Sequence, residues 1–252
     1  MMRKVVPSSL ISARCALSGS ARESASSTIA LDAAGLARVR DAFVDAARRA
    51  ARLGIDALEL HAAHGYLLHE FLSPLANQRG DGYGGSLAHR MRFPLEVFEA
   101  VRAAFPGDRP VGVRVSATDW MDHGWDLEQT IALARELSGR GADWIDVSSG
   151  GISPAQKIVL GPGYQVPFAE AIKRATGLPT MAVGLITTPA QAEDIVASGK
   201  TDLVALARAM LYDPRWPWHA AAELGATVDA PPQYWRSAPA GHAGLFGDQK
   251  PR

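Results

Sequence analysis

The chain has 252 residues, of which 47% are apolar, 21% charged and 7% aromatic, and its 26 basic residues balance its 26 acidic residues. This composition is typical of a globular protein and excludes a collagen-like, coiled-coil or wholly disordered chain. Zero net charge argues against a protein that coats nucleic acid or an anionic membrane, and no apolar run reaches the roughly 18 residues that span a bilayer. The single cysteine, Cys15, rules out an internal disulfide and a cysteine-based zinc site, which favours a reducing, cytoplasmic compartment.

Residues 1–28 differ in composition from the rest of the chain. They contain eight Ser, four basic residues and one acidic residue, with no clear period. An Arg- and Ser-rich, acid-poor segment is typical of a transit peptide, and a disordered extension has the same composition. We interpret this segment as a disordered or unrelated N-terminal extension. It precedes a domain over residues 29–225 and a C-terminal tail or flap over residues 226–252.

From residue 32 onward, apolar periodicity predicts helices that alternate with short strands. In chain order these are a helix at 32–53, a strand at 55–61, a helix at 87–104, a strand at 111–116, a helix at 126–140, a strand at 143–148, a strand at 179–184, a helix at 188–199, a strand at 202–208 and a helix at 214–224. Asp126 with Gln129 resembles a capping box, and Thr188 with Gln191 offers a second N-cap. A polar, Gly-rich loop spans residues 73–85.

Strands that alternate with helices indicate βα units and a parallel sheet, either doubly wound or closed as a (β/α)₈ barrel. A dinucleotide-binding open sheet usually carries G-x-G-x-x-G after its first strand, and no such motif directly follows the first strand here. Arg114 shares a strand face with Gly112 and Ser116, while the valines between them face the other way. A polar inner face favours the α/β barrel, although a closed barrel needs eight strands and only five are predicted.

Two histidines lie at the end of the first predicted strand. His61 and His64 are three residues apart, and Tyr66 follows them. Catalytic groups in parallel α/β folds lie at the carboxyl ends of strands, where two imidazoles can converge on one substrate oxygen as it becomes negative. Two other interpretations remain open: histidines satisfied in the core, and a metal site that adds His69 or Glu70. The metal site lacks the H-E-x-x-H pattern.

Arg114 is a cation that points inward from a strand. In a structural role it would form an ion pair inside the barrel, for instance with Glu59, because a buried charge needs a partner. In a functional role it would anchor an anionic ligand, or a cofactor that becomes anionic when it is reduced.

Gly184, Ala207 and Arg208 follow the last two strands. In barrels the loops at this position often bind phosphate through backbone N–H groups, a helix N-terminus and a cation. The aromatic segment at 231–235, which ends with Trp235, lies beyond the last helix. It is either a tail packed on the outside or a flap that covers a flat ligand.

Several of these stretches resemble the old yellow enzyme family, and within it the xenobiotic-reductase-like branch. The likeness runs from about Ala30 to Tyr234. It is carried by residues 61–74 (HAAHGYLLHEFLSP), 77–86 (NQRGDGYGGS) with Arg90, Arg114, 146–151 (DVSSGG), 183–184 and 207–208. The first two blocks are long and highly specific.

The resemblance implies an FMN enzyme on a (β/α)₈ barrel, an NADPH dehydrogenase of the ene-reductase type. NADPH or NADH reduces the flavin, which then passes hydride to an activated alkene such as an α,β-unsaturated carbonyl or a nitro compound. It implies a small-molecule substrate, with neither nucleic acid nor membrane as partner, and it is compatible with a homo-oligomer.

The resemblance also assigns roles to residues. His61 and His64 hold the electron-withdrawing oxygen of the substrate, and Tyr66 lines the same pocket. Arg114 lies beside the N1/C2-oxygen edge of the flavin. The phosphate is held by Gly184, Ala207 and Arg208. Trp235 belongs to a C-terminal segment that reaches an active site in this branch.

The chain departs from the family pattern at three places. Ala207 stands where Gly is common, and His89 stands where Asn is common. Family members also carry a longer segment before the helix at residue 32, which supplies the first three strands, so the five predicted strands would be the fourth to the eighth. The sequence therefore predicts a truncated or misassembled reading frame, and the alternative function is a catalytically inactive barrel fragment. A third hypothesis is a metal-dependent barrel hydrolase.

Overall fold

Five parallel strands form one sheet whose spatial order is the chain order, β1 to β5. The structure is a computed structural model that describes residues 30–247, so the interpretation of residues 1–28 lies outside it. The strands are β1 (Leu58–Ala62), β2 (Val111–Ser116), β3 (Trp144–Ser148), β4 (Thr180–Val183) and β5 (Leu203–Ala205). The helices are α1 (Ala33–Arg52), α2 (Leu67–Leu72), α3 (Leu87–Ala104), α4 (Leu127–Gly139), α5 (Val166–Thr176), α6 (Pro189–Ala197), α7 (Arg208–Tyr212) and α8 (Trp216–Glu223), followed by the 3₁₀ helix η1 (Pro232–Ser237).

All five predicted strands and all five predicted helices are present, and three further helices were not predicted. The unpredicted helices α2, α5 and α7 are short, and none has a side chain that caps its N-terminus. Without a capping residue the sequence carries little signal for where a helix begins. The strand that we predicted over 202–208 ends at Ala205, because Arg208 already begins α7.

The predicted caps of α4 and α6 are confirmed. The side chain of Asp126 accepts a hydrogen bond from the Gln129 backbone N–H at 2.9 Å, and that of Thr188 accepts one from Gln191 at 3.2 Å. Each bond satisfies a backbone donor that has no partner within its helix, so each helix begins where the sequence predicted.

Replacing Thr188 with alanine is expected to lower the free energy of unfolding by about 1 kcal/mol, because it removes the cap of α6. Urea denaturation would measure the loss. Thr188→Ser is the matched control, since it keeps the hydroxyl and should retain most of the stability. Equal losses in both variants would contradict the cap.

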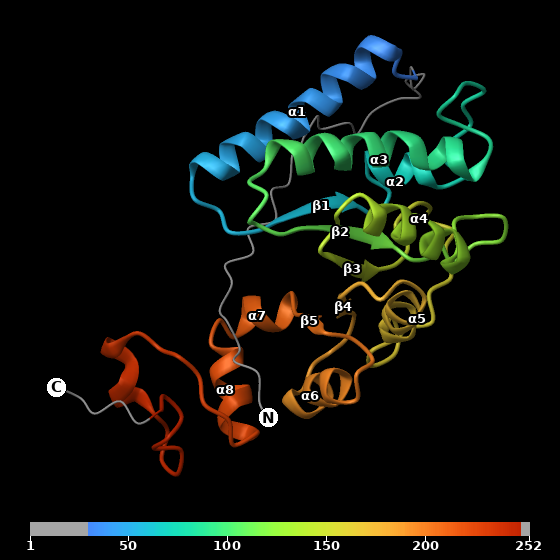
Figure 1. Cartoon of the computed structure of the whole chain (residues 1–252). Helices are drawn as coiled ribbons and strands as arrows, with labels where there is room; N and C mark the ends of the chain where they lie inside the picture. Colours follow the sequence, from blue (N-terminus) through green and yellow to red (C-terminus); the bar gives the residue numbers. More distant parts are fainter. Residues whose placement is uncertain (1–29, 248–252) are drawn as a thin grey trace, which may run out of the picture.

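The sheet has one apolar face covered by helices. Val111, Val113 and Val115 are at most 1% exposed and belong to the main hydrophobic core. Figure 1 shows α1 and α3 side by side over β1 and β2, with α4 next to α3 and α5 packed on β3 and β4. None of the helices within residues 30–247 is both long enough and apolar enough to cross a membrane.

The other face, here called the inner face, is polar. Strand pairing sets residues of neighbouring strands side by side: His61 pairs with Arg114, and Arg114 pairs with Asp146. Because side chains alternate along a strand, Glu59, Gly112, Ser116, Trp144 and Ser148 also face inward. The register therefore collects most of the polar side chains of β1 to β3 on one surface, as the barrel interpretation predicted.

Candidate functional site

His61, His64 and Tyr66 come together at the carboxyl end of β1, as predicted. The ring centroids of His61 and His64 are 5.2 Å apart, and those of His61 and Tyr66 are 5.4 Å apart. Tyr66 is more than half exposed, and both histidines are partly exposed. The three rings therefore form one partly exposed cluster at this strand end.

The conformation of His64 is unusual and is held by two serines. Its φ of 60° lies in the left-handed region, which costs a residue with a Cβ about 1–2 kcal/mol. The backbone N–H of His64 donates to Ser116 Oγ at 3.0 Å, and its Nε2 lies 2.6 Å from Ser148 Oγ. A substrate oxygen that binds Nε2 of His64 must therefore displace the Ser148 hydroxyl.

The loop after β1 and the loop after β3 meet backbone to backbone at two glycines. A Cβ on Gly65 would lie 2.2 Å from the Gly151 carbonyl oxygen, and one on Gly151 would lie 2.4 Å from the Cα of His64. Ser116 Oγ also donates to the Gly150 carbonyl at 2.8 Å. Only glycine permits this close approach of the two loops. The approach holds His64 between the ends of β1 and β3.

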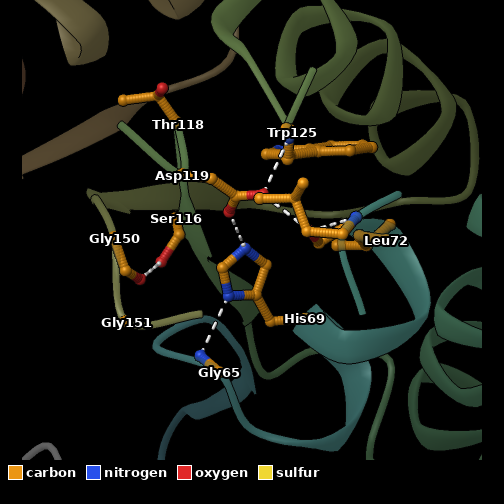
Figure 2. Close-up of polar contacts among 12 residues, drawn as sticks. Gly65, His69, Leu72, Ser116, Thr118, Asp119, Trp125, Gly150 and Gly151 are labelled. Atoms are coloured by element: carbon orange, nitrogen blue, oxygen red, sulfur yellow. Dashed lines mark hydrogen bonds and ion pairs between the residues drawn. The ribbon is translucent and has the colours of Figure 1, made fainter. Parts of the chain in front are cut away.

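His69 lies beneath the site rather than in it (Figure 2). It is fully buried, its Nδ1 accepts a hydrogen bond from Gly65 N–H at 2.9 Å, and its Nε2 lies 3.0 Å from Asp119 Oδ1. Both ring nitrogens are thus engaged away from His61 and His64, which does not support the metal set that added His69. Within the described range no group of three or more His, Cys, Asp or Glu residues is arranged to hold a metal ion.

Asp119 receives three contacts through its carboxylate. Besides His69, it accepts hydrogen bonds from Ser73 Oγ at 2.6 Å and from the Trp125 backbone N–H at 2.7 Å. Burial alone would raise the pKa of Asp119, but the hydrogen bonds from these three residues outweigh burial and lower it. The carboxylate is therefore charged at neutral pH.

Arg114 is on the inner face, as predicted, but its ion-pair partner differs from the one that we expected. Its Nε lies 3.4 Å from Asp146 Oδ2, whereas Glu59 contacts the Trp144 indole N–H at 3.3 Å. Burial, together with the negative charge of Glu59, raises the pKa of Asp146 to about 7, against the opposing effect of Arg114. Burial also raises the pKa of Glu59. Sequence reasoning missed Asp146 because it considered partners on β1 only.

Gly184, Ala207 and Arg208 follow two paired strand ends. Val183 of β4 pairs with Ala205 of β5, so the residues after them leave the sheet side by side. Gly184 has a φ of 118°, a conformation that disfavours any other residue. Arg208 begins α7 and is exposed. The structure therefore brings these residues to one edge of the sheet.

Trp235 lies in the C-terminal tail. Its indole N–H donates to the Ala230 carbonyl at 2.8 Å, and its ring packs on a small apolar cluster of Val228, Leu245 and Phe246. Figure 1 shows η1 well away from the strand ends that carry His61 and His64. Its assignment to substrate binding therefore stays a prediction, and this structure places it with the tail.

Sequence reasoning also missed the residues that hold the cluster. Ser116 and Ser148 could have been found from strand parity, because they face inward at paired positions of β2 and β3. The contact between His69 and Asp119 spans 50 positions of the sequence and follows no short motif.

Residues 8–226 match the profile of a family described as the NADH:flavin oxidoreductase / NADH oxidase family. The NADPH dehydrogenase of Geobacillus thermodenitrificans (strain NG80-2) is 49% identical over 203 residues, which cover 81% of this chain and 59% of that protein. The NADPH dehydrogenase of Geobacillus sp. (strain WCH70) is 51% identical over 195 residues, which cover 77% of this chain and 56% of that protein. The chain thus spans less than three fifths of the length of these curated relatives.

Solved structures with a similar fold include two reductases. A 2-naphthoyl-CoA reductase in complex with 2-naphthoyl-CoA has a TM-score of 0.72 at 28% identity, over 79% of this chain and 30% of that chain. Morphinone reductase in complex with tetrahydroNAD has a TM-score of 0.64 at 29% identity, over 80% of this chain and 52% of that chain. These neighbours confirm the predicted fold class, since the five parallel strands are part of a (β/α)₈ barrel.

Proposed function

This chain belongs to the NADH:flavin oxidoreductase / NADH oxidase family, the old yellow enzyme family that its motifs resemble, and we propose that it is an FMN-dependent NADPH dehydrogenase with ene-reductase activity. NADPH or NADH is the hydride donor, and the acceptor is an activated alkene such as an α,β-unsaturated carbonyl or a nitro compound. The observation that carries the proposal is the pairing of the His61 and His64 rings at one strand end, beside the face that holds Arg114.

The donors on the inner face and at the edge of β4 and β5 fit FMN. The Arg114 side chain is 27% exposed although its Nε faces Asp146, so the rest of its guanidinium can serve an electronegative ring edge. Arg208 is an exposed cation that follows β5, and β5 pairs with the strand that precedes Gly184, which suits a phosphate, and Ala207 adds its backbone N–H. When bound, FMN supplies the transfer of hydride from a nicotinamide nucleotide to the second substrate.

The histidine cluster orients the second substrate. The imidazoles of His61 and His64 donate hydrogen bonds to its electron-withdrawing oxygen, where negative charge develops, and Tyr66 covers the side of the same pocket. Removing one such donor typically lowers the rate by about 10²–10³. Ser116 holds the backbone of His64 in place before a substrate arrives, whereas Ser148 occupies Nε2 until a substrate oxygen displaces it.

His61→Ala is expected to abolish the binding of phenol while FMN stays bound, because the histidine contacts the substrate oxygen and not the phosphate edge. Titrating the purified, FMN-loaded chain with phenol and following the flavin absorbance would measure this. His242→Ala is the matched control, since His242 is exposed on the tail. Loss of FMN from the His61 variant before any loss of phenol affinity would contradict this role.

The spectrum of the unmodified chain decides between the proposal and its alternative. Flavins absorb at about 450 nm. A yellow protein that loses this absorbance when NADPH is added would support the reductase. A colourless, aggregating product would support the inactive barrel fragment, because an incomplete cofactor site loses contacts while the ordering costs remain. Activity that a chelator removes would instead support the metal-dependent hydrolase.

A further inference from the structure

His69 and Asp119 form a buried pair in which the contacts around the ring select the tautomer of His69 (Figure 2). Both side chains are fully buried. Because Gly65 N–H donates to Nδ1 of His69, that nitrogen carries a lone pair, and the proton of a neutral imidazole is then on Nε2, facing Asp119 Oδ1. Ser73 and the Trp125 backbone both donate to Oδ2, which keeps Oδ1 turned toward the ring.

Within this pair, the imidazole of His69 accepts from the backbone N–H of the residue that follows His64. The peptide between His64 and Gly65 ends in the N–H that His69 accepts, and its orientation sets both the φ of 73° at Gly65 and the strained conformation at His64. A strained backbone persists only where neighbouring groups over-determine it. Ser116 accepts from the backbone N–H of His64 itself, and His69 accepts from the backbone N–H of Gly65, the next residue.

We propose that His69 and Asp119 are positioning residues of the substrate site: Asp119 fixes the tautomer of His69, and His69 fixes the His64–Gly65 peptide so that the imidazole of His64 stands beside that of His61. This inference rests on the proposed function for its catalytic meaning, although the placement of His64 can be tested without it. Neither residue touches the substrate.

Asp119→Asn tests the tautomer without changing the volume of the side chain. The amide oxygen must take the position of Oδ2 to accept from Trp125, so the amide NH₂ faces Nε2 of His69. Nε2 must then accept, the proton moves to Nδ1, and Nδ1–H opposes Gly65 N–H. Long-range ¹H–¹⁵N spectra of the imidazoles in the full chain should show His69 protonated on Nε2 in the wild type and on Nδ1 in the variant.

The amide of Gly65 should exchange with solvent about tenfold faster in Asp119→Asn, while the Ile145 amide, deep in β3, keeps its rate. Phenol affinity should fall about tenfold, with FMN absorbance unchanged. Ser73→Ala is the control, because it removes another hydrogen bond to the same carboxylate yet leaves the tautomer intact. It should keep the wild-type exchange rate at Gly65 and the wild-type phenol affinity.

Two results would overturn the inference: an unchanged Gly65 exchange rate in Asp119→Asn, or an equal loss of phenol affinity in Ser73→Ala. His69→Phe provides a second route if Asp119→Asn folds poorly, because it keeps a ring and removes the acceptor for Gly65 N–H. A wild-type chain that binds no phenol would defeat the proposed function, whereas the exchange and tautomer measurements would still decide whether the pair positions His64.

Discussion

Replacing Gly65 with alanine is expected to lower the free energy of unfolding by about 3 kcal/mol, through backbone strain at a positive φ and through collision with a neighbouring carbonyl. Gly65 has a φ of 73°, and the new Cβ would lie 2.2 Å from the Gly151 oxygen. Backbone atoms cannot yield as the end of a flexible side chain can, so the two loops must separate. His64, which lies between them, loses its position at the same time.

Gly85→Ala separates the two contributions. Gly85 has nearly the same φ, 76°, but a Cβ there would meet nothing within 4 Å, so only strain remains and the loss should be about 1 kcal/mol. Urea denaturation of both variants would measure the difference. Equal losses at Gly65 and Gly85 would show that the two loops are not in contact in solution.

The second large effect is a pH dependence of stability that arises on the inner face. The pKa of Asp146 is raised to about 7 in the folded chain, chiefly by burial. A raised carboxyl pKa means that the folded state binds more protons than the unfolded state between the two pKa values. The contribution of Asp146 to the free energy of unfolding is therefore fully present below the unfolded pKa of about 3.9. It is lost as pH rises through about 7. The loss is on the order of 4 kcal/mol.

Asp146→Asn should remove most of this dependence, because the amide stays neutral at every pH. Thermal or urea unfolding at intervals from pH 4 to pH 8 would show a falling stability in the wild type and a much flatter curve in the variant. Asp108→Asn, on an exposed loop, is the control and should follow the wild type. The lowered pKa of Asp119 acts in the opposite direction and only at more acidic pH, so it does not mask the effect. A wild-type stability that rose from pH 5 to pH 8 would contradict the assignment.

The sheet and the histidine cluster could be predicted from the sequence because their signals are local. The valines of β2 alternate with Gly112, Arg114 and Ser116, and this period of two correctly assigned the two faces. The strand end after His61 follows from the same pattern, and the convergence of His61, His64 and Tyr66 follows from their spacing along the chain. The capped helices were placed to within about two residues for the same reason.

The contacts between distant segments could not be predicted. Which carboxylate pairs with Arg114 depends on the register between β2 and β3, and that register is set by packing rather than by any motif. The contact between His69 and Asp119 likewise depends on how α2 packs against the loop after β2. Helix α5 begins at a residue with no capping side chain, so its start is fixed by tertiary contacts.

The chain-order sheet has a consequence for how the molecule assembles and opens. Each strand after β1 pairs with the strand made just before it, so the sheet can grow one βα unit at a time as the chain is synthesised. The βα unit that contains β5 is the least stable part of the sheet, because β5 has only three residues and all of them are at least partly exposed. Fraying should therefore begin at the edge that carries Gly184 and Arg208. An anion bound there would oppose that fraying by mass action, so anion binding and the stability of this edge are thermodynamically linked.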